Sequence, residues 1–189
     1  MANERGLFYV QELPIGMRIA QVVGITSAAF LAGSTANFSF AGIPTILAAP
    51  ESSRPKLWHT MFNIGKKSGP GVAVVGSLAF VYLAARFRVP FSLYTASAIL
   101  LPSIVPYTYA FIGATNVKLL ARLDNLSSGA SSTDAAEKGV RAKEETDELL
   151  KRWGQVNWGR VVLVGAAAVS GLWAAVSRPE IVGFTKIGN

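Results

Sequence analysis

The distribution of charged residues is the strongest constraint that this sequence places on its fold. Four long stretches contain no Asp, Glu, Lys or Arg: 19–49, 68–85, 89–117 and 161–177. A helix that crosses the hydrocarbon core of a bilayer needs about 20 mostly apolar residues, with a range of roughly 17–25. The whole chain is 51% hydrophobic and 15% charged, whereas soluble domains carry about 25% charged residues. These features exclude an ordinary soluble globule, a disulfide scaffold and a disordered tail, and they indicate a multi-pass membrane protein.

We therefore predict an all-α fold, an integral membrane four-helix bundle that forms a single domain over residues 1–189. The expected spans are 19–46, 69–86, 90–115 and 157–177. Spans two and three follow each other so closely that a tight antiparallel hairpin is expected. Pro102 and Pro106 lie inside the third span, and internal prolines predict a kinked helix that opens a gap in the bundle. Gly42-Ile43-Pro44 predicts a bend near the end of the first span.

Two polar segments separate these spans. Residues 50–67 are predicted to form a short polar loop, and residues 118–155 a longer one. Within the longer segment, the Ser- and Gly-rich stretch 127–132 is typical of a flexible link. Residues 134–151 then have the composition of a charged amphipathic helix. We expect this short helix to lie outside the membrane, between spans three and four.

The Lys and Arg residues predict the orientation in the bilayer. The two loops after spans one and three, with Arg160 at the start of the fourth span, hold 12 of the 18 basic residues. The positive-inside rule places those loops in the cytosol and both termini on the non-cytosolic side. The same charges flank apolar spans, so the net charge of +7 is attributed to headgroups and orientation, and nucleic acid is not an expected partner. The endoplasmic reticulum or another endomembrane is the expected compartment.

The chain has no cysteine and a single histidine, His59. Disulfides, thiolate metal sites, iron–sulfur clusters and cysteine nucleophiles are therefore excluded, and a multi-histidine metal centre cannot form within one chain. No metal ligand is predicted. His59 is the one side chain whose ordinary pKa suits a general base near neutral pH. Its alternatives are a histidine on a surface loop and a lone axial haem ligand, and no other motif supports haem.

Polar groups at membrane depth are costly, which makes them candidates for function. The third span carries one polar stripe on a single helical face, made of Pro102, Pro106, Tyr109 and Asn116. The start of the fourth span carries another, made of Trp153, Asn157 and Arg160. If these helices are neighbours, the stripes converge at the cytosolic mouth of the bundle in a pocket with one positive charge, two carboxamides, a phenol and an indole.

Each of these residues also has a structural interpretation. Arg160 can extend to lipid headgroups, and Trp153 can belong to the aromatic belt at the interface. Asn116 and Asn157 can join helices through hydrogen bonds. Three further residues, Tyr107, Thr108 and Asn37, are candidates for substrate binding, although Asn37 can instead cap a bend in the first span.

Four short motifs in a fixed order resemble those of a known family. They are Trp58-x-x-x-Phe62-x-x-Gly65, Pro106-Tyr107-Thr108, Thr115-Asn116-x-x-Leu119 and, after an acidic stretch, Trp153-x-x-x-Asn157-x-x-Arg160. Together with the order of the spans they resemble the anthrone oxygenases, which are small four-span membrane proteins. The resemblance covers nearly the whole chain. It departs at Asn157, where many family members carry a histidine.

The resemblance implies a membrane-embedded oxygenase that oxidises an anthrone to an anthraquinone with O₂ in fungal aromatic polyketide biosynthesis. Its implied partners are the lipid bilayer and a flat aromatic polyketide, and a homo-oligomer is possible. O₂ is the expected co-substrate and no cofactor is predicted, with haem or a metal left open. Arg160 and Asn116 would stabilise an oxyanion, and Tyr109 and Asn157 would orient groups or relay a proton. In the same scheme Trp153 would stack on the substrate and His59 would act as the base.

Two other functions fit a small four-span protein. A membrane scaffold without catalysis would depend on the charged helix 134–151 more than on the polar groups within the spans. A transporter or channel is disfavoured, because the uncharged stretches hold no carboxylate for ion coupling and the sequence shows no inverted repeat.

Overall fold

Four long apolar helices dominate the computed structural model, which describes residues 6–10, 13–87, 93–127, 135–177 and 182–186. Side chains are described for 13–87, 93–125 and 145–177. The helices long and apolar enough to cross a membrane are Ile15–Ala48, Glu51–Phe87, Leu93–Asn125 and Glu145–Val176. The predicted four-span membrane bundle is therefore confirmed, and the protein is a multi-pass membrane protein.

The spans are built from shorter elements. The first contains α1 (Ile15–Asn37), the π-helical turn η1 (Phe38–Gly42) and α2 (Ile43–Ala48). The 3-10 turn η2 (Glu51–Ser53) leads into α3 (Arg54–Phe87), which forms the second. The third contains α4 (Leu93–Leu100), α5 (Ile104–Tyr107), the π-helical turn η3 (Thr108–Ile112) and α6 (Gly113–Ser127), and the fourth belongs to α7 (Ala135–Val176).

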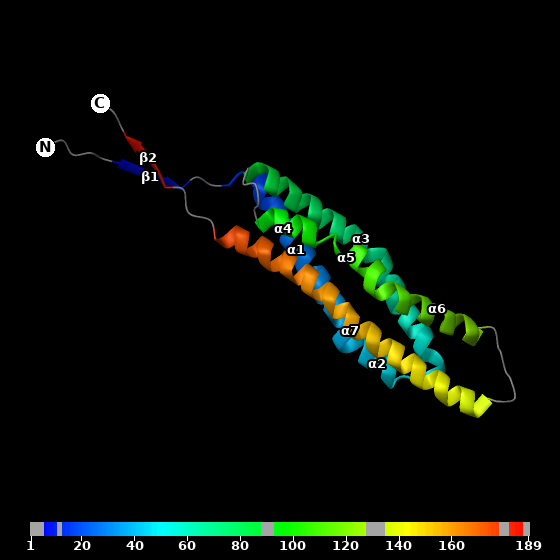
Figure 1. The fold of residues 1–189 in the computed structure, drawn as a ribbon. Helices are drawn as coiled ribbons and strands as arrows, with labels where there is room; N and C mark the ends of the chain where they lie inside the picture. Colours follow the sequence, from blue (N-terminus) through cyan, green and yellow to red (C-terminus); the bar gives the residue numbers. More distant parts are fainter. Residues whose placement is uncertain (1–5, 11–12, 88–92, 128–134, 178–181, 187–189) are drawn as a thin grey trace.

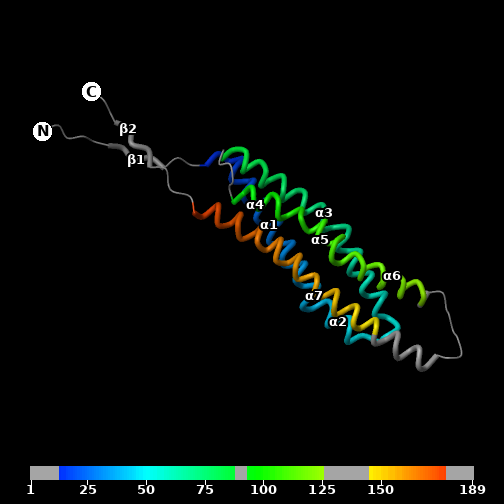
Figure 2. The backbone as a smooth tube through the Cα atoms, in the orientation of Figure 1, coloured from blue at the N-terminus to red at the C-terminus, as the bar shows by residue number. Residues whose placement is uncertain are grey.

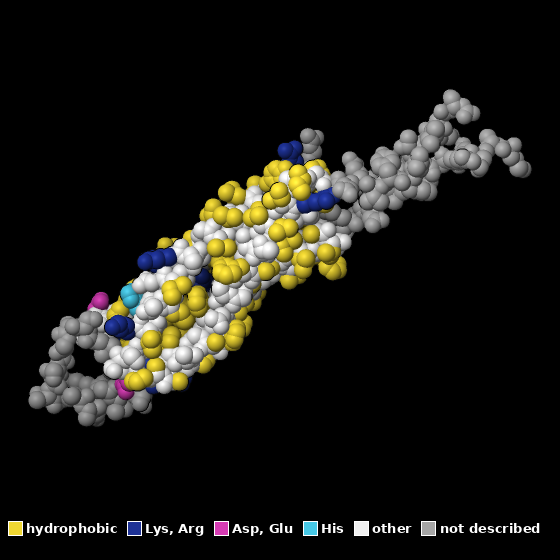
Figure 3. Space-filling view, turned by 180° about the vertical axis from the view of Figure 1, so that it is seen from behind, with side chains coloured by type: hydrophobic (Ala, Val, Ile, Leu, Met, Phe, Trp, Pro, Cys, Tyr) yellow, Lys and Arg dark blue, Asp and Glu magenta, His cyan; other side chains and the backbone are white. Residues whose placement is uncertain are grey.

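The four spans run in alternate directions along the bundle (Figures 1 and 2). α1 packs against α3 and α7, and α4 packs against the same two helices. The start of α1, the end of α3 and the end of α7 thus lie at one end of the bundle, and α2 and the start of α3 lie at the other. On the face shown in Figure 3, hydrophobic side chains are spread over the surface between the ends, and the visible Lys and Arg side chains lie mostly towards the two ends. Side chains such as Phe30, Val162 and Trp173 are more than 60% exposed there, which suits contact with lipid.

The predicted interruption of the third span is present, since α4 ends at Leu100 and α5 begins only at Ile104. A second irregularity follows at η3, and the first span has its own π-helical turn, η1, directly before the predicted bend at Pro44. π-helical turns are rare and occur often at functional sites. A functional site is therefore expected at the level of the bundle where the turns η1 and η3 lie.

The structure corrects two expectations about the polar segments and adds one unexpected element. Most of the expected loop 50–67 is helical, because α3 begins at Arg54. The helix expected over 134–151 is present but is not separate from the fourth span: α7 runs without a break from Ala135 to Val176, and its buried residues Leu149, Leu150 and Trp153 pack on neighbouring helices. The termini add an unexpected antiparallel ribbon, in which β1 (Gly6–Val10) pairs with β2 (Val182–Lys186), Gly6 lying opposite Lys186 and Val10 opposite Val182. The flexible link expected over 127–132 and the turn between spans two and three fall largely outside the described residues.

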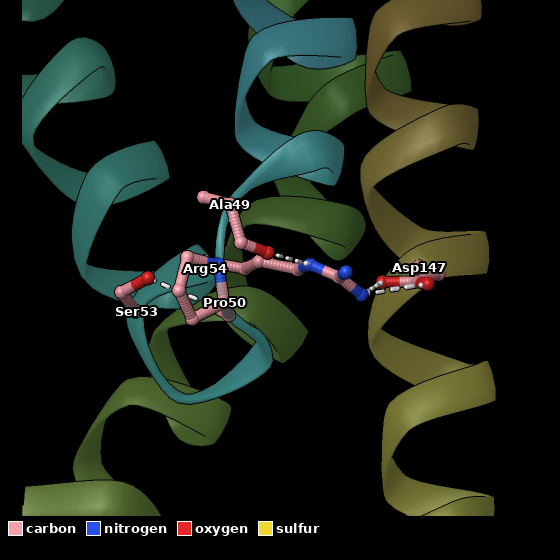
Figure 4. Close-up of polar contacts among 5 residues, drawn as sticks. All are labelled: Ala49, Pro50, Ser53, Arg54 and Asp147. Carbon is pink, nitrogen blue, oxygen red and sulfur yellow. Dashed lines mark hydrogen bonds and ion pairs between the residues drawn. The ribbon is translucent and has the colours of Figure 1, made fainter.

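Ion pairs join the spans at the end opposite the ribbon. The Arg54 guanidinium donates to both carboxylate oxygens of Asp147, at 2.7 and 2.9 Å, and to the carbonyl oxygen of Ala49 at 3.0 Å (Figure 4). These bonds connect the start of α3 and the end of the first span to α7. Arg122 on α6 forms an ion pair with Glu145 on α7. The bundle is therefore held together by charge pairs at this end and by apolar contacts along its length.

Candidate active site

A cavity of about 340 Å³ lies between α3, the α5–α6 part of the third span and α7. It is on the side of the bundle towards the Arg54–Asp147 pair, since it begins two turns after the start of α3. Most of its walls are apolar. Its lining residues are Phe62, Gly65, Lys66, Gly69, Pro70, Ile104, Val105, Thr108, Tyr109, Gly113, Asn116, Val117 and Arg160. Two basic side chains and no carboxylate line it, so its electrostatic character is positive.

Arg160 is the charged group of this cavity that lies deepest in a span. Its Nη1 donates to the carboxamide oxygen of Asn157 at 3.2 Å, and its Nε is buried with no hydrogen-bond partner. Among the described side chains, none of the carboxylates pairs with this guanidinium. A buried charge without a counter-ion is costly, and it therefore favours an anionic group on a guest in the cavity.

Asn157 is fully buried behind Arg160. Its Nδ2 donates to the carbonyl oxygen of Thr35 at 2.9 Å and to Oγ of Ser39 at 2.8 Å. Both amide hydrogens are therefore used, and only the oxygen is left to face Arg160. The Asn157 carboxamide does not line the cavity. Its oxygen instead accepts a hydrogen bond from the guanidinium of Arg160, which does line it.

Asn116 and Trp153 are joined across α6 and α7. The indole Nε1 of Trp153 donates to Oδ1 of Asn116 at 2.9 Å. An indole nitrogen can only donate, so the contact identifies the amide oxygen, and the Nδ2 group of Asn116 is the end that remains for the cavity. No described residue accepts a hydrogen bond from that Nδ2 group. Trp153 itself is 2% exposed and packs edge-on against Trp58, and it does not line the cavity.

The other predicted residues have mixed positions. Thr108 and Tyr109 line the cavity, Thr108 with its hydroxyl bonded to the carbonyl oxygen of Ile104 at 2.6 Å and Tyr109 with 80% of its surface exposed. Tyr107 lies beside it, where its hydroxyl donates to the carbonyl oxygen of Val156 at 2.9 Å.

His59 and Asn37 are not part of the cavity wall. His59 lies in the first turns of α3 instead of a loop, half-buried, with Nε2 3.0 Å from Nδ2 of Asn63. It precedes the cavity residue Phe62 by about one helical turn. Asn37 is exposed at the end of α1, directly before η1, which places it at a helix irregularity.

Lys66 and Phe62 are cavity residues that sequence reasoning did not select. The Lys66 ammonium lies 5.9 Å from the centre of the Phe62 ring. Phe62 and Gly65 belong to the Trp58 motif, but the polar composition of 50–67 favoured a loop and hid their helical spacing. Among the described residues, no three His, Cys, Asp or Glu side chains group closely enough to bind a metal ion.

Comparison with known proteins decides the family. Residues 58–170 match the sequence model described as anthrone oxygenase, and this range includes every residue of the cavity. The chain belongs to the anthrone oxygenase family. It is 31% identical over 172 residues to the anthrone oxygenase encC of Aspergillus fumigatus, covering 86% of this chain and 95% of that one. It is 27% identical over 158 residues to a noranthrone monooxygenase of Aspergillus flavus, covering 80% and 71%.

A more distant relative is the anthrone oxygenase AgnL2 of Paecilomyces divaricatus, which is 22% identical over 158 residues, covering 80% of this chain and 92% of that one. No solved structure matches the chain. Family and relatives together indicate an oxygenase enzyme.

Proposed function

We propose that this protein oxidises an anthrone to an anthraquinone with O₂, by stabilising the anthrolate anion in the cavity beside Arg160. The observation that supports this most is the guanidinium of Arg160, which lies in a mostly apolar cavity and pairs with none of the carboxylates whose side chains the structure describes. The donor end of Asn116 lines the same cavity. A positive charge and an amide N–H group in a dry site are the groups that a phenolate-like oxygen requires.

The cavity also suits the shape of an anthrone. Its volume of about 340 Å³ lies within the range of roughly 300–1,000 Å³ that small-molecule sites occupy. Tyr109 and Val117 line it and are also 80% and 67% exposed on the outer surface of the bundle. The cavity is therefore accessible from the apolar surface, where both a flat tricycle and O₂ are more soluble than in water.

The proposed reaction consumes one anthrone and one O₂ and forms one quinone and one water. The anthrone methylene loses a proton, and its carbonyl oxygen becomes the anthrolate oxygen bound by Arg160 and Asn116. The electron-rich anion passes one electron to O₂, and recombination forms a carbon–oxygen bond to a peroxide. The first proton returns to the terminal peroxide oxygen; loss of the second methylene proton and cleavage of the O–O bond then release hydroxide, which combines with that second proton to form water, and leave the new carbonyl. Stabilisation of a developing oxyanion by one donor is commonly worth about 3–4 kcal/mol.

Two side chains are assigned to the removal of the methylene proton. Tyr109 lines the cavity and would relay the methylene proton towards its rim. His59, one turn before Phe62 on α3, would accept it there. Trp153 contributes by fixing the amide of Asn116, and Asn157 by holding Arg160.

The orientation predicted for the bundle in the bilayer determines the side of the membrane on which the cavity lies. With the termini on the non-cytosolic side, the cavity lies in the cytosolic half of the bundle, where a product of a soluble biosynthetic enzyme can reach it. An endomembrane and a role in aromatic polyketide biosynthesis remain part of the proposal. The absence of a cofactor is also part of the proposal. An absorption spectrum and a metal analysis of the purified protein test it, and a haem Soret band would contradict it.

The decisive experiment compares Arg160→Ala and Asn116→Ala with the wild-type protein in detergent, with an anthrone under air. Quinone absorbance and O₂ uptake are recorded together, and wild type should consume one O₂ per quinone. We expect Arg160→Ala to lower kcat about 10²–10³-fold, with a smaller loss for Asn116→Ala. Arg86→Ala is the matched control, because Arg86 lies 5.3 Å from the Tyr82 ring at the far end of α3. Full activity in Arg160→Ala would remove the proposed role, and no quinone from wild type would favour the scaffold.

A further inference from the structure

Ser39 lies at the centre of a buried polar cluster with Gly154 and Asn157; unlike these two residues, it belongs to none of the motifs and lies outside the range 58–170 that the family model matches. It lies in the π-helical turn η1 and is 9% exposed, 19 residues before the matched range begins at residue 58. Its hydroxyl donates to the carbonyl oxygen of Gly154 on α7 at 2.9 Å and accepts from Nδ2 of Asn157 at 2.8 Å. The cluster therefore joins the first span to the fourth directly behind the cavity.

The direction of each hydrogen bond in this cluster is fixed by its chemistry. A carbonyl oxygen can only accept, so the Ser39 hydrogen points to Gly154 and its lone pairs face Asn157. The second hydrogen of the Asn157 amide is taken by the carbonyl oxygen of Thr35, one helical turn before Ser39, at 2.9 Å. With both hydrogens held by the first span, Oδ1 must face the guanidinium of Arg160. An amide turned the other way would present hydrogens to a cation.

We propose that Ser39 is a positioning residue for the oxidation, which it serves by holding the Asn157 amide so that its oxygen keeps Arg160 directed into the cavity. This inference rests on the proposed function for its kinetic consequence. Ser39 does not line the cavity and acts only through Asn157. Its loss leaves the amide with one anchor, the Thr35 carbonyl, and lets it rotate away from Arg160.

The kinetic signature of such a role differs from that of a structural one. The anthrone that binds is neutral and is held by apolar walls, whereas the charge that Arg160 meets develops only on deprotonation. Interactions stronger in the transition state than in the ground state change kcat and leave KM nearly constant. A displaced catalytic group can cost about 10²-fold in rate. We expect Ser39→Ala to lower kcat about 10- to 100-fold with little change in KM.

Ser97 provides a matched control. It is a fully buried serine of the third span whose hydroxyl lies 2.9 Å from two carbonyl oxygens, that of Leu93 in its own helix and that of Ala167 on α7, so its one hydrogen is shared between them. Ser97→Ala thus removes the same kind of bond to the same helix, about two turns away from Arg160. We expect similar losses of thermal stability in Ser39→Ala and Ser97→Ala, and a fall in kcat in Ser39→Ala alone. Ser39→Thr keeps the hydroxyl and should recover most of the wild-type kcat.

A second measurement does not depend on catalysis. The probe is 2-hydroxyanthraquinone, a flat tricycle whose phenol changes colour when it ionises. Bound beside Arg160, its phenol should ionise at a lower pH than in empty detergent micelles, because a nearby positive charge favours the anion. Ser39→Ala should move this midpoint back towards the micelle value, whereas Ser97→Ala should leave it in place.

The outcomes separate this inference from the proposed function. If wild type oxidises anthrone but Ser39→Ala keeps the wild-type kcat and dye midpoint, the positioning role is refuted and the oxygenase proposal stands. If wild type forms no quinone, the proposed function fails, and the dye midpoint alone decides the role of Ser39. Should Ser39→Ala not fold, Ser39→Cys keeps the volume with a weaker donor, and the same two results decide.

Discussion

The contact between Tyr107 and Gly159 allows a sharp prediction about the helix that carries Arg160. A Cβ atom built on Gly159 would overlap the hydroxyl oxygen and Cζ of Tyr107. The Tyr107 ring cannot move aside freely, because it stacks on Phe111 at 4.7 Å and its hydroxyl donates to Val156. Gly159→Ala must therefore separate α5 from α7 or break these contacts.

The size of the effect follows from two contributions. Overpacking costs about 1–3 kcal/mol, and the lost hydrogen bond to Val156 costs about 0.5–1.5 kcal/mol. The sum, about 1.5–4.5 kcal/mol, corresponds to a fall in Tm of about 3–18 °C for a chain of this length. The assay is thermal unfolding of the purified protein in detergent, followed by circular dichroism.

Gly165→Ala is the control on the same helix, since nothing lies within 4 Å of a Cβ atom there. Alanine is a better helix former than glycine by about 1 kcal/mol, so this variant should be no less stable than wild type. The double variant Gly159→Ala with Tyr107→Ala should lose less than the sum of the two single changes, because removal of the ring makes room for the methyl group. Equal Tm values for Gly159→Ala and Gly165→Ala would refute the reasoning.

Three further predictions concern packing, the site and the charge pair. Phe80→Ala should lower the free energy of unfolding by about 3–5 kcal/mol, because the ring is fully buried; a change below 1 kcal/mol in the same unfolding assay would contradict this packing. Trp153→Phe keeps an aromatic ring but removes the donor to Asn116, so kcat for quinone formation should fall; because Trp153 is buried, the lost hydrogen bond and volume should also lower stability by about 1–3 kcal/mol. An unchanged kcat would show that catalysis does not require Trp153 to hold the Asn116 amide in place. Arg54→Ala should lower stability by about 1–3 kcal/mol, since it leaves the half-buried Asp147 unpaired; adding Asp147→Ala should restore part of the loss, and no recovery would contradict a specific pair.

The fold could be predicted largely from the sequence because the bilayer reduces the possible structures to a few. Four uncharged stretches require four helices, and the prolines at 102 and 106 place the interruption between α4 and α5 correctly. The boundaries were less predictable. Polar composition at residues 50–67 suggested a loop, yet α3 starts at Arg54 because its guanidinium is satisfied by Asp147 and Ala49. Such partners lie far away in sequence and leave no local signal.

The sequence likewise predicted some features of the candidate site and missed others. Helical spacing placed Asn116 in one stripe and Trp153 and Arg160 in another, and the structure brings these stripes together through the Trp153–Asn116 bond. Periodicity could not say which members face the cavity, because the direction of a side chain depends on its neighbours. Trp153 thus points into the core between helices. Lys66 was missed because a lysine at the end of an apolar span is usually assigned to headgroups.

The hydrogen-bond partner of Arg160, the amide oxygen of Asn157, determines how much of the positive charge remains available to a bound molecule. The depth of Arg160 in the span does not determine this. An arginine in a span is commonly neutralised by a carboxylate, and such a pair has little charge left for a guest. Here none of the carboxylates with described side chains pairs with Arg160, and the guanidinium is held by the oxygen of a neutral amide. A carboxamide supplies a dipole that orients the cation without cancelling its charge. Under the proposed function, the charge of Arg160 thereby stays available, beside that of Lys66, in a mostly apolar cavity, where an anion formed from a neutral substrate is the species that gains most from it.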